Sequence, residues 1–180
     1  EDIPIATHPK LSLTKLGDDE ELVGISIEEG VGVADVLPES DEVTASFIQA
    51  AARESVYNLR IENNFVSDTP IVLDIDTGVS NCALHLNLDI GRNCEFELIT
   101  QISGAAPWTG VLRTGKIGDG SIVNDVVIGH TDSGILLRVD SIAIGRDAQV
   151  KAGTVSSGSD RTKADLRYKM GETGGHLNVL

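Results

Sequence analysis

The sequence predicts an all-β protein, a right-handed parallel β-helix with about 27 residues per coil and a small N-terminal α/β cap. The first observation is a repeat: segments that begin at Leu86, Arg113 and Asp140 align at two successive steps of 27 residues. The repeated dipeptides are Ile90-Gly91, Ile117-Gly118 and Ile144-Gly145, with a fourth copy one residue early at Met170-Gly171. A fixed period of this size is typical of a solenoid, in which each repeat buries the apolar face of its neighbour.

The second observation is that each repeat contains strands and tight turns. Apolar and polar residues alternate with period two over residues 84–90, 94–98 and 163–170, as in strands with one exposed face. Gly, Asn and Asp are frequent in the intervening turns, such as 91–93, 118–120 and 145–147. No helical pattern interrupts this half of the chain, so a helix-based repeat is disfavoured. The strings IGRNCE, IGDGSI and IGRDAQ resemble the hexapeptide of left-handed β-helix acyltransferases, but 27 is not a multiple of six, and the wider right-handed coil fits better.

The same step aligns apolar positions, which are expected to stack as inward-facing columns. One column is Ile90, Ile117 and Ile144, and a second is Leu112, Val139 and Leu166. Phe96, Val123 and Val150 also coincide.

Residues 1–56 are expected to form the strand-and-helix cap and residues 57–180 the β-helix core. Residues 1–16 carry no reliable pattern, and strands are predicted at 22–27 and 31–37. Ser40, Asp41 and Glu42 then indicate the start of a helix that ends near residues 53–55, because acidic side chains in a first turn complement the helix dipole. Strands at 57–61 and 70–75 lead into the repeat.

The order of these parts resembles a known family. A "GVGVADVL" strand, a short acidic helix, "NLRIENNFVSDTPIVLDI" and "LNLDIGRNCEFELITQISG" precede a glycine-punctuated β-helix. Over residues 22–180 this resembles the SufB/SufD (SufBD) family of iron–sulfur cluster assembly proteins. The resemblance implies a cytoplasmic, non-catalytic scaffold that acts with an ABC-type ATPase (SufC-like) and with a second SufB/SufD-type subunit or as a self-dimer. It also implies that an iron–sulfur cluster is carried transiently in the full complex.

The family's functional residues cannot be placed on this sequence. Its cysteine, histidine and glutamate for cluster assembly lie late in the β-helix, and its ATPase-docking helices lie at the C-terminus. This chain begins without Met and ends within a strand pattern at 176–180. We therefore expect a fragment that lacks the C-terminal region, with no assigned cluster ligands.

The residues themselves offer one weak metal-site candidate, made of Cys82, His85 and Cys94. The alternation argues against it, because Cys82 shares the inward parity of Leu84 while His85 points outward. Buried free thiols and a surface imidazole are the simpler interpretation. His130 lies near Asp132 and Ser133, but adjacent residues of one turn rarely converge as a catalytic triad. Trp108 is expected to pack on the outer face of the coil or to contact a partner.

Composition narrows the function classes. The chain has 28 acidic and 14 basic side chains, a net charge of −14, which disfavours nucleic-acid binding. No run approaches the ~20 apolar residues of a membrane span. Two cysteines make no disulfide framework, which favours a cytosolic protein.

Two alternatives to the scaffold remain: a carbohydrate-active or acyl-transfer β-helix enzyme, and a purely structural β-solenoid. The repeat aligns Arg92, Asp119 and Arg146 as a polar stripe, but aromatic residues are only 3% of the chain and no carboxylates pair on neighbouring repeats. Sugar-cleaving sites need such groups, so we expect no catalytic residues.

Overall fold

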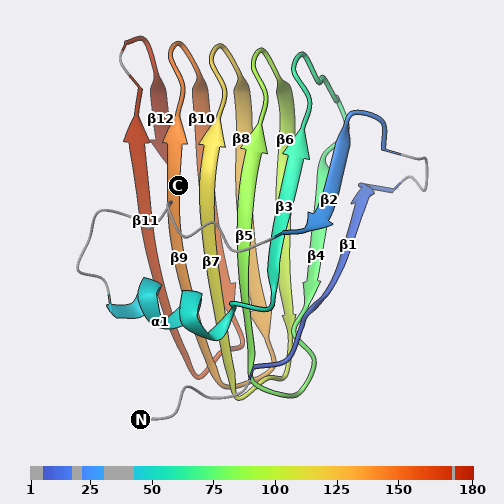
Figure 1. Ribbon diagram of the computed structural model, residues 1–180, viewed down its shortest axis with the longest axis vertical. Helices are drawn as coiled ribbons and strands as arrows, with labels where there is room; N and C mark the ends of the chain where they lie inside the picture. Colours follow the sequence, from blue (N-terminus) through green and yellow to red (C-terminus); the bar gives the residue numbers. More distant parts are fainter. Residues whose placement is uncertain (1–5, 18–21, 31–42, 172) are drawn as a thin grey trace.

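The computed structural model describes residues 6–17, 22–30, 43–171 and 173–180, and it confirms the predicted parallel β-solenoid, with about five coils of about 27 residues. Two six-stranded sheets face each other (Figure 1). In this view the parallel strands of the front sheet rise, the chain crosses over the top to the rear sheet, and successive coils advance from right to left. The coil is therefore right-handed.

Each coil contributes one strand to each sheet. Sheet A, in front, has the strand order β2 (Ile25–Glu29), β3 (Val56–Ile61), β5 (Cys82–Ile90), β7 (Trp108–Ile117), β9 (Ile135–Ile144) and β11 (Arg161–Met170). Sheet B, behind, has the order β1 (Lys10–Lys15), β4 (Ile71–Asp76), β6 (Glu95–Gly104), β8 (Ile122–Thr131), β10 (Gln149–Ser157) and β12 (His176–Val179). Neighbouring strands are parallel except at β1 and β2, which pair antiparallel with β4 and β3.

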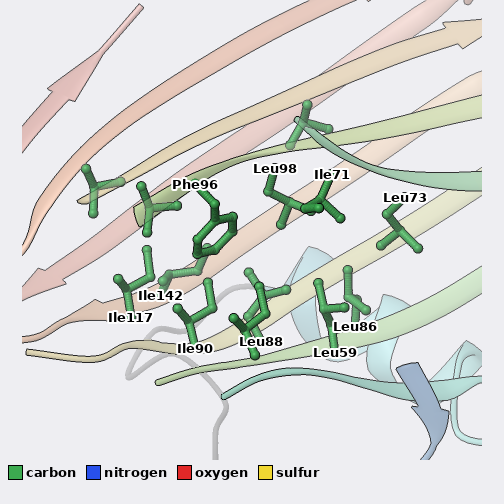
Figure 2. Packing of buried hydrophobic residues seen from close by; sticks show 14 of the residues in the cluster. Leu59, Ile71, Leu73, Leu86, Leu88, Ile90, Phe96, Leu98, Ile117 and Ile142 are labelled. Atoms are coloured by element: carbon green, nitrogen blue, oxygen red, sulfur yellow. The ribbon is translucent and has the colours of Figure 1, made fainter. Parts of the chain in front are cut away.

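The core lies between the two sheets. Ile90 pairs with Ile117, and Ile117 with Ile144, and all three side chains are buried. Figure 2 shows Phe96 of sheet B pointing toward Ile90 and Ile117 of sheet A. Because like positions stack at each step, apolar residues of successive coils contact one another and exclude water from the interior.

The second expected inward column is wrong: Leu112 and Val139 do not face the interior, and Leu166 does not stack on them. Leu112 pairs with Val139, but Val139 pairs with Asp165, a step of 26 residues, and Leu166 pairs with Asp140. A step shorter by one residue reverses the face on which a side chain lies. Leu166 therefore points into the interior, whereas Leu112 and Val139 lie on the outer face of sheet A.

The helix α1 (Val43–Ala51) covers that outer face and not the end of the solenoid, as Figure 1 shows. Ala45 and Ile48 are buried against Leu112 and Val139. Phe47 contacts Trp108 edge to face, with ring centroids 5.2 Å apart.

The N-terminal end of the solenoid is covered instead by β1 and β2. The strand β1 forms where no structure was predicted, because Leu11 and Leu13 pack against the core. The predicted helix start at Ser40, Asp41 and Glu42 and the predicted strand at 31–37 lie outside the described residues.

The turns that lead from sheet A to sheet B stack as tightly as the strands do. The Gly118 N–H donates to the Ile90 carbonyl at 2.9 Å, and a Cβ added at Gly118 would lie 2.4 Å from the Gly91 carbonyl oxygen. The third turn position has positive φ in four coils, at Asn64, Asn93, Gly120 and Asp147. Gly, Asn and Asp adopt this conformation at the least cost, which explains the turn composition.

Ile117→Asp should unfold the solenoid, because it places an unpaired carboxylate in a stacked apolar column and should lower the free energy of unfolding by more than about 4 kcal/mol. The matched control is Asp119→Asn, two residues away in the turn. Asp119 Oδ1 accepts a hydrogen bond from the Arg146 N–H at 2.9 Å, and Asn63 Oδ1 accepts the same bond from the Arg92 N–H two coils earlier, so asparagine should be tolerated. Urea unfolding followed by circular dichroism measures both changes. Equal stability of the two variants would contradict the column.

Candidate functional site

Four charged side chains meet inside the apolar core, and we call them the interior ion cluster: Arg113, Asp125, Arg138 and Asp140. Their side chains are at most 5% exposed. Arg113 donates to Asp140 at 2.8 Å and to Asp125 at 2.6 Å. Arg138 donates to both carboxylate oxygens of Asp140 at 2.9 Å and also to Thr154 Oγ1 at 3.1 Å. Two guanidinium groups thus neutralise two carboxylates in a water-poor environment.

The cluster joins three successive strands and both sheets. Arg113 lies on β7 and is directly paired with Asp140 on β9. Asp125 lies on β8 of the opposite sheet, so the Arg113 side chain bridges the interior. These contacts hold neighbouring coils in one register, since a slip by one residue would turn one partner outward and leave the other charge buried.

Burial and the neighbouring charges both shift pKa values in and beside the interior ion cluster. Removal from water lowers the pKa of Arg113, but Asp125 and Asp140 outweigh that effect and raise it above the ordinary value. Burial, and then the two carboxylates, raise the pKa of Tyr168 on β11 to about 12. Arg113 Nε and Asp125 Oδ2 are buried without a hydrogen-bond partner among the described residues. Each such atom costs about 1–3 kcal/mol, so the cluster is not what stability alone would select.

Chemically, the cluster is suited to fixing charges. Guanidinium groups stay protonated near neutral pH and donate without accepting. The four side chains include no thiol, imidazole or hydroxyl nucleophile. Both carboxylates are engaged by guanidinium groups, so the arrangement supports charge pairing within the solenoid.

Sequence reasoning missed this cluster, although the repeat held the signal for it. Leu86, Arg113 and Asp140 occupy the same position of three successive coils, and Leu86 has inward parity. Asp125 likewise takes the place of Leu98 in the coil before it. A charged residue in an apolar column, matched by an opposite charge one coil away, is the pattern that could have revealed the site.

The weak metal-site candidates are not brought together. Cys82 and Cys94 are buried free thiols. Burial raises the pKa of Cys82 to about 12, with a smaller contribution from Asp76, so the thiolate is strongly disfavoured. Cys94 Sγ donates to the Glu62 carbonyl at 3.2 Å. Within the described residues, no group of three or more His, Cys, Asp or Glu side chains is placed to hold a metal ion.

His85 was expected to be an exposed imidazole, and that expectation is wrong. It points outward from β5 but is only 2% exposed, in the region of sheet A that α1 covers. Its Nε2 lies 2.7 Å from Thr114 Oγ1 on β7. Burial lowers the pKa of His85, which disfavours the charged ring.

The other candidate residues also have structural partners. His130 Nδ1 lies 2.9 Å from Ser157 Oγ on the neighbouring strand β10, and this pair is exposed. Arg92, Asp119 and Arg146 lie in the stacked turns, where Asp119 receives the Arg146 N–H and lies 3.9 Å from its guanidinium. Within the polar stripe, Asp119 and Arg146 are therefore partners of each other, and the Arg92 N–H donates to Asn63 Oδ1.

Comparison with known proteins finds no matching protein family, no matching curated protein and no matching solved structure. Among the helices that the structure describes, none is long and apolar enough to cross a membrane.

Arg113→Met should lower the free energy of unfolding by about 3–5 kcal/mol, because it leaves Asp125 buried without its cation. Adding Asp125→Leu should restore much of the loss, since it removes the orphaned carboxylate. The control is Lys116→Met on the same strand, whose pair with Asp89 is 66% and 46% exposed and should be worth less than about 1 kcal/mol. Denaturant unfolding measures all three. No recovery in the double variant would contradict the proposed charge pairing.

His85→Gln should weaken the dependence of the free energy of unfolding on pH between pH 5 and pH 7. Because burial lowers the pKa of His85 below 6.5, the unfolded chain binds the proton more readily. The contribution of the neutral His85 ring to the free energy of unfolding is complete above pH 6.5 and is lost as the pH falls. The free energy of unfolding changes through this residue by at most about 1.4 kcal/mol per pH unit. Glutamine can keep the hydrogen bond to Thr114 without this titration. Parallel stability profiles of the two proteins between pH 5 and pH 7 would refute the assignment.

Proposed function

We propose that this chain is a non-catalytic scaffold component of an iron–sulfur cluster assembly complex of the SufB/SufD type, acting with an ABC-type ATPase. The support is the order of parts. Within the described residues, the motifs after the helix occupy consecutive strands and turns, and the parallel β-solenoid that the resemblance implies is the fold observed.

The observation that carries the proposal is the place of the quoted motifs in the fold. "NLRI" lies in β3, "PIVLDI" enters and forms most of β4, and "LNLDI" ends β5. "GRNC" then makes the second of the stacked turns, with Asn93 at φ 54°. The resemblance therefore covers the part of the chain where the regular coil begins, and it is not scattered over unrelated loops.

A scaffold of this kind needs rigid surfaces, and the solenoid offers two flat sheets. The net charge of −14 would favour partners with basic surfaces and would speed their association. An iron–sulfur cluster would be cargo of the complex. The buried thiols Cys82 and Cys94 are closed to such a cargo in this conformation.

The test is isolation of the tagged full-length protein from its native host without oxygen, followed by identification of bound proteins and by iron and sulfide analysis. Recovery of an ABC-type ATPase is the expected result. A Gly118→Val bait, whose Cβ would collide with the Gly91 carbonyl, should lose the ATPase, whereas the Asp119→Asn bait should retain it.

Two results would count against the proposal. The first is a clean protein with neither ATPase nor iron. The second is a bound sugar or acyl compound, which would favour the enzyme alternative.

A further inference from the structure

The outer face of sheet B carries several apolar side chains that are only partly buried. The helix α1 packs on β5, β7 and β9 of sheet A, on the front of the molecule in Figure 1. The burial pattern alternates along β6 and β8, so every second residue points away from the core. Five outward aliphatic side chains form what we call the β8 face: Ile99, Ile122, Val126, Ile128 and Val155. Ile122 is 43% and Val155 56% exposed.

Charge is segregated across this sheet. The outward residues of β8 are Ile122, Asn124, Val126, Ile128 and His130, with no Asp, Glu, Lys or Arg. On β10 the outward residues include Lys151 and no carboxylate. On the other side of β8, outward positions of β4 and β6 hold Asp74, Asp76, Glu95 and Glu97. In a chain with 28 acidic residues, an apolar strip that separates acidic from carboxylate-free strands resembles the centre of an interface.

Gly153 on β10 is a second, independent observation. Its φ is not positive, and an added Cβ would meet only the Val126 side chain, at an ordinary 3.6 Å. The fold of the single chain therefore gives no reason for a glycine there, although glycine weakens a strand interior. Such a residue often marks a place where another surface approaches closely.

We propose that the β8 face binds a second copy of this chain, face to face, about a two-fold axis parallel to β8. This axis places β6 of one copy over β10 of the other. Glu97 and Lys151 lie at the same level of the sheet, because both pair with Asn124, so each Glu97 meets the Lys151 of the other copy. Ile99 and Gly153 share the level of Val126, so Ile99 enters the gap that Gly153 leaves.

The size of the surface is adequate. At about 3.3 Å per residue and about 4.8 Å per strand, β4, β6, β8, β10 and β12 present about 600 Å² of flat sheet, and side-chain relief adds to this. A standard interface buries about 800 Å² per partner. The inference does not rest on the proposed iron–sulfur function, since it is argued only from the charge, packing and glycine of this face.

The first test is the oligomeric state of the full-length protein by sedimentation over a concentration series. The wild type should be a dimer. Val126→Lys should raise its dissociation constant by at least about 100-fold, because two ammonium groups then meet near the axis. The matched control is Val79→Lys, at a turn position that is 78% exposed and away from this face, which should leave the dimer intact.

The second test exchanges charges. Glu97→Lys alone and Lys151→Glu alone should each be monomeric, because like charges then face each other. An equimolar mixture of the two variants should form a heterodimer, since every facing pair in it is opposite in charge. The double variant should dimerise again. These outcomes require a second copy and the stated axis, because a structural effect of either substitution would not be repaired by mixing.

Thermal unfolding by circular dichroism verifies that each variant is folded. A monomeric wild type, a dimer unaffected by Val126→Lys, or singly exchanged variants that fail to associate on mixing would each overturn the proposal. None of these results bears on the recovery of an ATPase, so the two proposals fail separately.

Discussion

Each coil of this protein hydrogen-bonds to the next through its turns as well as through its strands. The Gly118 N–H bonds to the Ile90 carbonyl, and the Gly145 N–H bonds to the Ile117 carbonyl in the same way. At this separation a turn cannot carry a Cβ at its first position, and its third position must accept a positive φ. The repeated Ile-Gly dipeptide is therefore the mark of one constraint, the close approach of successive backbones.

The same constraint decides what the interior can contain. Stacking places the same position of every coil in one column, so a charged residue in a column needs an opposite charge in a neighbouring coil. Arg113 follows Leu86 in its column and is neutralised by Asp140, the next member, and by Asp125 across the interior. A buried ion pair of this kind is often no more stable than an apolar replacement. Its evident effect here is to fix the register of the coils.

The two outer faces have different roles because the chain covers only one of them with a helix. On sheet A, Leu112, Val139 and Trp108 are sheltered by α1. On sheet B, the β8 face has no cover within the described residues, and the charges around it are separated by sign. An exposed aliphatic strip on a highly acidic chain is unfavourable in water unless another surface covers it.

The sequence by itself determined the period, the turns and the strand alternation, because these depend on local spacing that repeats at 27 residues. It was also sufficient for the stacking of Ile90, Ile117 and Ile144. Alternation alone does not reveal which face of a strand will be covered. Only the tertiary structure therefore decided that Leu112 and Val139 lie beneath α1 and that His85 is buried.

The interior ion cluster likewise could not be predicted without the tertiary structure. Arg113 and Asp125 lie on opposite sheets, and their contact follows from the width of the coil, not from their separation in sequence. The step of 26 residues that turns Leu166 inward is likewise set by the length of one turn. These features arise where distant strands meet, and local sequence patterns do not specify that geometry.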